Sequence, residues 1–468
     1  MTQPLWTAAD IATATGAQIL GVWSVNGVSI DSRTVAEGEL FVALVGENND
    51  AHEYIDQALA RKAGALLLSR LPANLPAGAP VALVKDTMVA LEALGQFARK
   101  RCKAKFAAVT GSVGKTSTKE ALTQLLAKQA LTYGSKGNLN NNFGVPLSLA
   151  RLPVKSTYGV FELGMNHPGE IAPLSQQVAP SVVIVTTIAP AHVEYFDDGV
   201  EGIAREKASI AAGLTPGGTA ILTRDTPYYE VLYEAAKAAG AARIFSFGTD
   251  VAADVRLTAY VPDADGAEVS INFFGRWFTY RIGAQGKHQA INSLGVLAAI
   301  DAIGGNVEQA MEDYAEIGAP AGRGQRSVLA WGKGEIVLFD ESYNASPVAV
   351  RAALGVLGQQ PGRRIVVLGD MLELGAGGPE MHMGLLDAVN AAGLHKVFAC
   401  GPLMKPLYDA LPEASKGLWA PTSEALKSAL LALIAPGDVV TIKGSLGMRM
   451  GPLVAAVREA SSAKGSAS

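Results

Sequence analysis

Apolar residues along the chain form short runs that alternate with segments of helical spacing. In the first hundred residues, three such runs are followed by a pattern in which Leu91, Leu94 and Phe97 recur at three-residue spacing. The runs are LFVAL at 40–44, ALLLS at 65–69 and VALVK at 81–85. Asp86 or Thr87 can cap the helix, because a side-chain oxygen accepts hydrogen bonds from the free amides of a first turn. This part of the chain is therefore predicted to be a small α/β domain.

From residue 105 the apolar runs become uninterrupted, as in strands that are buried on both faces. They are FAAVT at 106–110, YGVFEL at 158–163, SVVIVTTI at 181–188 and TAILT at 219–223. Segments with helical periodicity separate them, and a long helical pattern follows at 288–304. Strand and helix in turn predict a doubly wound, mostly parallel sheet with crossover helices.

A third α/β series begins after GAPAGRGQR at 318–326, whose glycine and proline content predicts a linker. Its expected strands are IVLFD at 336–340, RIVVLGD at 364–370, KVFAC at 396–400 and DVVTIKG at 438–444. We therefore expect an α/β protein of three domains, at residues 1–103, 104–317 and 318–468. The central sheet would be flanked by a small N-terminal α/β domain and a Rossmann-like C-terminal α/β domain. The length of 468 residues agrees with about three domains.

The composition narrows the class of protein. With 49% hydrophobic and 18% charged residues, the chain has the balance of a globular protein. Its net charge of -4 and lack of a basic block argue against nucleic acid or an anionic membrane as a partner. The two cysteines lie far apart in the sequence, which argues against a disulfide framework or a cysteine-built metal site. No apolar run approaches the ~18 residues of a membrane span and no signal peptide is recognisable, so we expect a cytoplasmic protein. A monomer is taken as the default.

The most informative stretch is AVTGSVGKTSTKE at 108–120, where an apolar strand meets a helix. The common P-loop requires a glycine at the place of Val109, so this loop is shorter than that pattern. Gly111 and Gly114 still allow backbone amides to approach phosphate, Lys115 brings a positive charge, and the Thr116 hydroxyl can bind Mg²⁺. The alternative is a glycine turn with a surface lysine, but the strand, the helix and the Lys-Thr pair together favour nucleotide binding. The expected nucleotide-binding residues of the loop are Gly111, Ser112, Val113, Gly114, Lys115, Thr116 and Ser117.

Further polar residues follow the ends of neighbouring strands, where ligands collect in such sheets. Glu162 ends an apolar strand, and a buried carboxylate there needs a cation or a salt bridge, such as one to Lys115. His192 follows the next strand, although a single loop histidine is more often structural. Lys207 lies on an expected helix, where by itself it would be a solvated lysine near Glu206.

The short loop resembles the nucleotide loop of the Mur ligase superfamily, ATP-dependent enzymes that join a carboxylate to an amine. The asparagine-rich stretch NLNNNFGVPLSLARL at 138–152 is similar to the segment that follows the loop in these enzymes. The resemblance implies ATP and Mg²⁺, with Thr116 and Glu162 as ligands of one magnesium ion and His192 as a ligand of a second. It makes Lys207 a lysine that carbamylation converts into a magnesium-positioning group, and it makes Lys115, Lys207 and His192 catalytic.

The same resemblance covers residues further along the chain. It places His288 and Asn292 on a helix against the adenine, Arg323 at an ATP phosphate and Asp340 at the ribose. A planar guanidinium with five donors suits phosphate. A surface or packing role remains the alternative for each of them.

Two C-terminal stretches indicate the branch of the superfamily. DESYNASP at 340–347 and LGDMLELG at 368–375 are similar to signatures of the branch that adds D-alanyl-D-alanine to UDP-N-acetylmuramoyl-tripeptide (UDP-MurNAc-tripeptide). The N-terminal stretch at 29–59 resembles the part of that branch that binds the uridine nucleotide, where Ser32 and Arg33 are the expected contacts. Residues that depart from the branch pattern are Ala51, Glu341, Ser346 and Leu446.

The resemblance thus implies a UDP-sugar-binding first domain, an ATP-binding central domain and a ligase C-terminal domain that react through an acyl phosphate. Three alternatives are another ligase of the superfamily, such as folylpolyglutamate synthetase, a P-loop NTPase that drives motion, and an inactive nucleotide-binding scaffold. The third residue of the peptide, the modification of Lys207 and the domain arrangement are left open.

Overall fold

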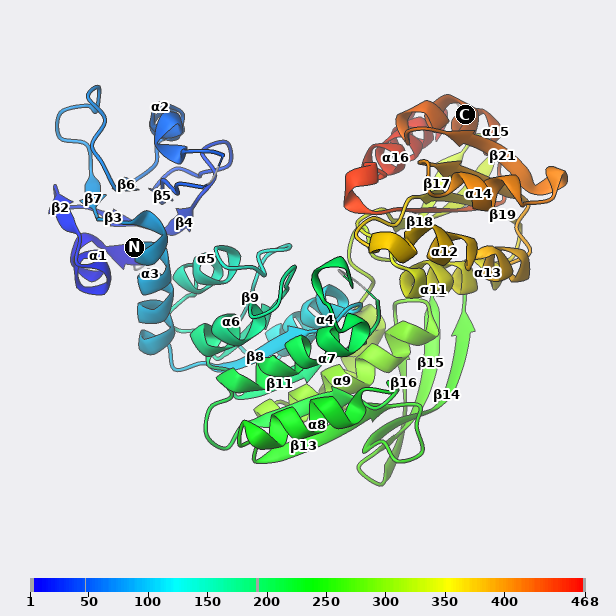
Figure 1. The fold of residues 1–468 in the computed structure, drawn as a ribbon, viewed down its shortest axis with the longest axis horizontal. Coiled ribbons are helices and arrows are strands. Elements are labelled where there is room, and N and C mark those ends of the chain that lie inside the picture. Colours follow the sequence, from blue (N-terminus) through cyan, green and yellow to red (C-terminus); the bar gives the residue numbers. More distant parts are fainter. Residues whose placement is uncertain (1–3, 47, 191–192, 466–468) are drawn as a thin grey trace.

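Three large β-sheets organise the chain in the computed structural model, which describes residues 4–46, 48–190 and 193–465. Figure 1 shows the units built on the first and third sheets at opposite ends of the central unit. The expected fold class is confirmed: the central sheet is mostly parallel, with a small α/β unit before it and a mostly parallel α/β unit after it. Among the described residues, no helix is both long and apolar enough to cross a membrane.

The first sheet has the strand order β2-β7-β6-β5-β4. Its strands are β2 (Gln18–Leu20), β4 (Gly27–Ser29), β5 (Glu39–Val42), β6 (Ala65–Leu68) and β7 (Val81–Leu83), beside a short pair, β1 (Trp6–Thr7) with β3 (Ser24–Val25). The helices are α1 (Ala8–Thr15), α2 (Ile55–Ala60) and α3 (Thr87–Arg101). The Asp86 carboxylate accepts hydrogen bonds from the amides of Met88 and Val89, which confirms the expected cap of α3.

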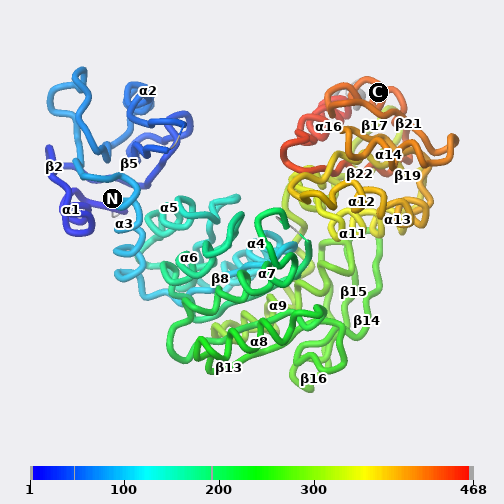
Figure 2. Tube along the Cα trace, in the orientation of Figure 1, coloured from blue at the N-terminus to red at the C-terminus, as the bar shows by residue number. Residues whose placement is uncertain are grey.

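Helix α3 carries the chain from the first unit into the central one, as Figure 2 shows. The two units share a core, because Leu147 and Ala150 of the central unit pack among the apolar residues of the first sheet. Across this junction the Trp6 indole N–H donates a hydrogen bond of 2.8 Å to the carbonyl of Ala150. Within the first unit, the guanidinium of Arg101 at the end of α3 lies 3.8 Å from the Trp6 ring centroid. The first unit is therefore packed firmly onto the central one.

The central sheet has nine strands in the order β16-β15-β14-β13-β12-β11-β8-β10-β9. The strands are β8 (Lys105–Thr110), β9 (Thr132–Gly134), β10 (Tyr158–Glu162), β11 (Val182–Val185), β12 (Thr219–Thr223), β13 (Arg243–Gly248), β14 (Val255–Asp263), β15 (Gly266–Phe273) and β16 (Arg276–Ile282). Pairing is parallel from β9 to β14 and antiparallel from β14 to β16.

Helices cover both faces of the central sheet, as the pattern of strand and helix predicts. They are α4 (Lys115–Ala127), α5 (Gly144–Ala150), α6 (Ile171–Val178), α7 (Gly199–Ala208), α8 (Tyr229–Ala238), α9 (Lys287–Ile303) and α10 (Val307–Asp313). Apolar residues of α4 and α9 share one core with the sheet, and those of α5 to α8 share the other. The parallel strands between these two layers are buried on both sides, which explains their uninterrupted apolar runs.

The third sheet has the order β17-β18-β22-β19-β20-β21, and only its edge pair β17·β18 is antiparallel. The strands are β17 (Gln325–Trp331), β18 (Gly334–Glu341), β19 (Arg363–Gly369), β20 (Lys396–Cys400), β21 (Lys416–Ala420) and β22 (Asp438–Lys443). The helices are α11 (Pro347–Gly358), α12 (Gly378–Met383), α13 (Leu386–Ala391), α14 (Lys405–Asp409), α15 (Lys427–Leu433) and α16 (Gly451–Gly465). Residues 317–324, which precede β17, form neither helix nor strand, so the linker expected at 318–326 is irregular up to Gly324 and its last two residues belong to β17.

Candidate active site

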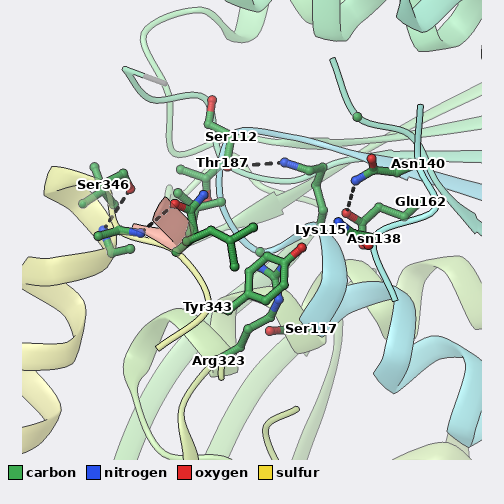
Figure 3. Close-up of a pocket in the computed structure, with 18 of the residues that line it drawn as sticks. Ser112, Lys115, Ser117, Asn138, Asn140, Glu162, Thr187, Arg323, Tyr343 and Ser346 are labelled. Atoms are coloured by element: carbon green, nitrogen blue, oxygen red, sulfur yellow. Dashed lines mark hydrogen bonds between the residues drawn. The ribbon is translucent and has the colours of Figure 1, made fainter. Parts of the chain in front are cut away.

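A cavity of about 600 Å³ lies where strand ends of the central sheet face loops of the third sheet. Figure 3 shows side chains from both sides pointing into this space. The central unit contributes Ser112–Lys115, Ser117, Asn138, Asn140–Asn142, Glu162, His288 and Asn292. The third unit and its linker contribute Arg323, Glu341, Tyr343, Asn344, Ser346, Leu372–Leu374, Lys443 and Leu446. We refer to this space as the ATP cavity, because it contains the expected nucleotide loop.

The nucleotide loop between β8 and α4 is shaped by its glycines. Gly111 and Gly114 have φ values of +147° and +93°, which side-chain-bearing residues adopt rarely. A Cβ atom at Gly111 would lie 1.9 Å from the Thr186 hydroxyl. The Ser112 hydroxyl donates to the carbonyl of Ala189 at 2.8 Å and accepts from its amide at 3.0 Å, which ties the loop to the segment after β11. The loop thus has a defined shape at the positive end of the α4 dipole, as a phosphate site requires.

Lys115 is the first residue of α4 and lines the cavity. Its ammonium donates a hydrogen bond of 2.7 Å to the carbonyl of Gly111, within its own loop. Burial lowers the pKa of Lys115, the charge of Glu162 opposes that shift, and the charge of Arg323 adds to it. Two cations therefore converge near this loop, which favours an anionic ligand.

Glu162 ends β10 and is only 1% exposed. The Thr116 hydroxyl donates to one of its carboxylate oxygens at 2.7 Å, and the Asn140 amide donates to the other at 2.8 Å. The carboxylate therefore takes its hydrogen bonds from these two residues. The salt bridge to Lys115, which the sequence left open, is not formed. A hydroxyl and a carboxylate this close together offer the oxygen ligands that Mg²⁺ prefers.

Lys207 lies on α7 with a side chain that is 2% exposed, so the solvated lysine considered from the sequence is wrong. Its pKa is lowered well below the usual value by burial and, secondarily, by the charge of Lys115. The neighbouring Glu206 accepts hydrogen bonds of 2.8 Å from the amides of Gly169 and Ile171, at the start of α6. Lys207 thus lies outside the cavity wall but within electrostatic reach of the nucleotide loop.

The structure separates the other expected ATP contacts into two groups. His288, Asn292 and Arg323 line the cavity, and burial lowers the pKa of His288. Asp340 is buried behind the wall, where it accepts a hydrogen bond of 2.6 Å from the Ser342 hydroxyl and faces Arg458 at 3.5 Å. His192 lies outside the described residues.

Within the described part of the chain, no group of three histidine, cysteine or acidic side chains is arranged to hold a metal ion. The expected magnesium ligands Thr116 and Glu162 do lie together, with 2.7 Å between the hydroxyl and a carboxylate oxygen. This incomplete set fits a metal that keeps several water molecules and shares the phosphates of a bound nucleotide.

Sequence reasoning missed three features of the cavity. Asn140 orients Glu162, although only the asparagine-rich composition of its segment was noted. Glu341 pairs with Lys443 at 3.0 Å in the wall, and both side chains are largely buried. Tyr343 packs on Arg323. Since all three depend on contacts between distant segments, only their position inside recognisable motifs could have indicated them.

A second cavity, of about 650 Å³, lies against the first sheet. We refer to it as the uridine-side cavity, because the residues expected to contact the uridine nucleotide line it. Both expected contacts line it: the Ser32 hydroxyl donates to Gln57 at 2.7 Å, and Arg33, with a side chain 77% exposed, pairs with Asp31. Leu139 and Arg151 of the central unit complete its wall. Because Asn138 and Asn140 line the ATP cavity, one segment borders both cavities.

Comparison with known proteins agrees with this geometry. Residues 109–300 match the model of the Mur ligase middle domain, and residues 325–446 match that of the Mur ligase glutamate ligase domain. The chain is therefore a member of the Mur ligase family. A UDP-N-acetylmuramoyl-tripeptide–D-alanyl-D-alanine ligase of Escherichia coli strain K12 is 34% identical, over 93% of this chain and 94% of that protein.

Solved structures give the same assignment. A crystal structure of MurF from Acinetobacter baumannii has a TM-score of 0.85 and 30% identity, covering 97% of this chain and 99% of that one. MurF ligase from Thermotoga maritima in complex with ADP has a TM-score of 0.77 and 26% identity, covering 94% of this chain and 98% of that one. Within the Mur ligases, the chain thus belongs to the UDP-N-acetylmuramoyl-tripeptide–D-alanyl-D-alanine ligases, the MurF branch.

Proposed function

We propose that this chain is the ATP-dependent ligase that adds D-alanyl-D-alanine to UDP-MurNAc-tripeptide through an acyl phosphate, giving the UDP-MurNAc-pentapeptide precursor of peptidoglycan. The observation that carries the proposal is the shared ATP cavity, where the nucleotide loop faces the DESYNASP and LGDMLELG segments. Family membership disfavours a P-loop motor, and the branch signatures disfavour folylpolyglutamate synthetase.

Each domain then has a separate task. Residues 1–103 bind the uridine nucleotide, residues 104–317 bind ATP, and residues 318–468 present the dipeptide. Support comes from the segment at 138–151, which lines the ATP cavity with its asparagines and the uridine-side cavity with Leu139, Leu147 and Arg151. A peptide that extends from the sugar along this segment would bring its terminal carboxylate to the nucleotide loop.

The chemical difficulty is that a carboxylate is a poor electrophile. Its oxygen attacks the γ-phosphorus of ATP, the bond from that phosphorus to the bridging oxygen breaks, and ADP leaves. The neutral amine of the dipeptide then attacks the acyl carbon, and the tetrahedral intermediate expels phosphate while the amine loses a proton. Catalysis of this kind depends on positioning and on charges near the phosphoryl group.

Lys115 and the amides of residues 111–117 hold the phosphates, and Arg323 approaches them from the linker side. Displacing the Lys115 ammonium from its own Gly111 carbonyl at 2.7 Å costs one hydrogen bond, which a charged phosphate oxygen replaces with a stronger one. His288 and Asn292 would lie against the base. The expected contact of Asp340 with the ribose stays a prediction, because Asp340 does not line the ATP cavity in this structure.

Thr116 and Glu162 would hold Mg²⁺, whose chemistry here is to neutralise phosphate charge. His192 and Lys207 complete the expected set of catalytic residues, with His192 as a ligand of a second Mg²⁺. A buried amine that stays neutral can react with carbon dioxide, so the position of Lys207 supports its carbamylation to an acidic group.

Closure of the third domain about residues 318–324 would exclude water from the acyl phosphate, which otherwise hydrolyses. The proposed enzyme acts as a monomer.

The test measures phosphate release by the purified chain in the presence of ATP and Mg²⁺. UDP-MurNAc-tripeptide and D-alanyl-D-alanine are added first separately and then together. The proposal predicts sustained release and a pentapeptide nucleotide only when both are present. Equal release without either substrate would contradict it.

A further inference from the structure

The linker before the third sheet carries an arginine that rests on an aromatic ring. The Arg323 guanidinium lies 4.1 Å from the centroid of the Tyr343 ring. Both side chains are half-buried and line the ATP cavity, and Figure 3 shows the ring lying against the arginine, with Ser117 and Lys115 nearby. The face of a tyrosine ring attracts a cation, and the planar guanidinium stacks well on it.

The backbone around this pair is interlocked. The Tyr343 amide donates to the carbonyl of Gly322 at 3.1 Å, and the Gly324 amide donates to the carbonyl of Asp340 at 2.9 Å. Gly322 has a φ of +73°, and a Cβ atom there would lie 2.9 Å from the Tyr343 Cβ. The linker and the turn after β18 are therefore packed as one unit, in which the ring sets the direction of the arginine.

We propose that Tyr343 is a positioning residue, whose ring holds Arg323 at the wall of the ATP cavity so that the guanidinium meets the phosphates of ATP. The inference rests on the proposed function, because it takes Arg323 to be a phosphate contact. A free arginine side chain has many rotamers, and restricting it to one of them when ATP binds costs conformational entropy. An arginine that the ring already holds in that rotamer avoids this cost on binding. Tyr343 belongs to the DESYNASP segment, so the orientation of the Arg323 guanidinium depends on the position of this segment of the third unit.

Two simpler roles would also make Tyr343 important: contact with a substrate, or support of the fold. A double-mutant cycle separates them from positioning, because a residue that acts through Arg323 has no effect once Arg323 is removed.

The experiment measures the affinity of the full chain for a nonhydrolysable ATP analogue with Mg²⁺ by calorimetry. Tyr343→Leu should weaken binding about two- to fivefold, the range of a partly exposed cation–π contact. Tyr343→Phe should bind as the parent chain does, since the ring is kept. In an Arg323→Ala background, Tyr343→Leu should cause no further loss. An equal loss in both backgrounds, or no loss in either, would overturn the proposal.

The chain offers a matched control. The Arg224 guanidinium also lies 4.1 Å from a ring centroid, that of Tyr229, which lies at the start of α8 and away from the cavity wall. Tyr229→Leu should leave analogue binding unchanged. If Tyr343→Leu fails to fold, Tyr343→Met replaces it in the same cycle: the side chain stays apolar but lacks the ring, so a loss that disappears in the Arg323→Ala background supports the proposal and an equal loss in both backgrounds refutes it.

Failure of this inference can be told apart from failure of the proposed function. Phosphate release by the parent chain tests the ligase reaction without any variant. If release needs both substrates but the cycle shows independent effects, only the role of Tyr343 is wrong. If release needs neither substrate, the ligase reaction is wrong, while the binding cycle still reports on the ring and the arginine.

Discussion

Gly164 offers a way to disturb the proposed magnesium site without changing a proposed ligand. A Cβ atom at this position would lie 2.8 Å from the Asn140 Cγ and Nδ2 and 2.9 Å from its Oδ1, whereas ordinary contact begins at 3.4 Å. The backbones cannot move apart easily, because the Gly164 amide donates to the Asn140 carbonyl at 2.8 Å. In Gly164→Ala the Asn140 amide must therefore move or rotate, and it loses its 2.8 Å hydrogen bond to Glu162.

The size of the effect follows from that hydrogen bond. A hydrogen bond to a charged group contributes about 1.5–3 kcal/mol, and outer partners of a metal ligand are worth about 10–100-fold in metal affinity or activity. We expect Gly164→Ala to lower kcat/KM by about tenfold to a hundredfold and to raise the Mg²⁺ concentration needed for half-maximal rate. Phosphate release measured across a Mg²⁺ titration gives both values.

Two further variants make the reasoning refutable. Asn140→Ala removes the side chain that the new methyl group would strike, so adding Gly164→Ala to it should cost nothing more. Gly355→Ala is the control: this helical glycine is exposed, nothing lies within 4 Å of its Cβ, and the change should stabilise the fold by about 0.4–1 kcal/mol without affecting rate. Parent-like activity of Gly164→Ala, or a loss that persists in the Asn140→Ala background, would refute the account.

Three other predictions concern the side chains of Lys115, Cys400 and Lys443. Lys115→Ala should abolish ATP-dependent ligation while the protein keeps its thermal unfolding temperature, because within the described part of the chain the ammonium donates hydrogen bonds to its own loop alone, at 2.7 and 3.5 Å; a fully active variant would exclude the proposed phosphate contact. Burial raises the pKa of the Cys400 thiol to about 12, so at pH 8 it stays protonated and iodoacetamide should not label it until the chain unfolds, as mass spectrometry can show. Lys443→Met should lower the free energy of unfolding by about 3 kcal/mol in chemical denaturation, because it leaves the largely buried Glu341 carboxylate without its cation; an unchanged midpoint would argue against that pair as a structural contact.

The sequence predicts the doubly wound core well, because its strands are apolar on both faces. It misses the antiparallel extension of β14 to β16, where one face packs on the core and the other is exposed. In β15, for example, buried and half-buried residues alternate along much of the strand. Such a mixed pattern at the edge of a parallel sheet is weaker evidence for a strand than an apolar run.

In the candidate site, too, residues in local motifs were predictable, whereas those whose position depends on tertiary packing were not. The loop at 111–117 and Glu162 were predictable from local spacing at strand ends, and both line the cavity in part. The burial of Lys207 was not, since it depends on how α7 packs and places the lysine near the charges of Lys115 and Glu162. Asp340 was expected at the nucleotide, yet the structure turns its neighbour Glu341 into the cavity, as the side-chain alternation along β18 requires.

The central claim is that the tripeptide carboxylate itself attacks ATP. The most direct test uses tripeptide nucleotide with ¹⁸O in the terminal carboxylate, and mass spectrometry of the phosphate formed during ligation. An acyl-phosphate mechanism predicts that each phosphate released per dipeptide joined carries one ¹⁸O atom from the peptide, because the bridging oxygen leaves with phosphorus. Unlabelled phosphate, with the pentapeptide nucleotide still forming, would contradict the mechanism.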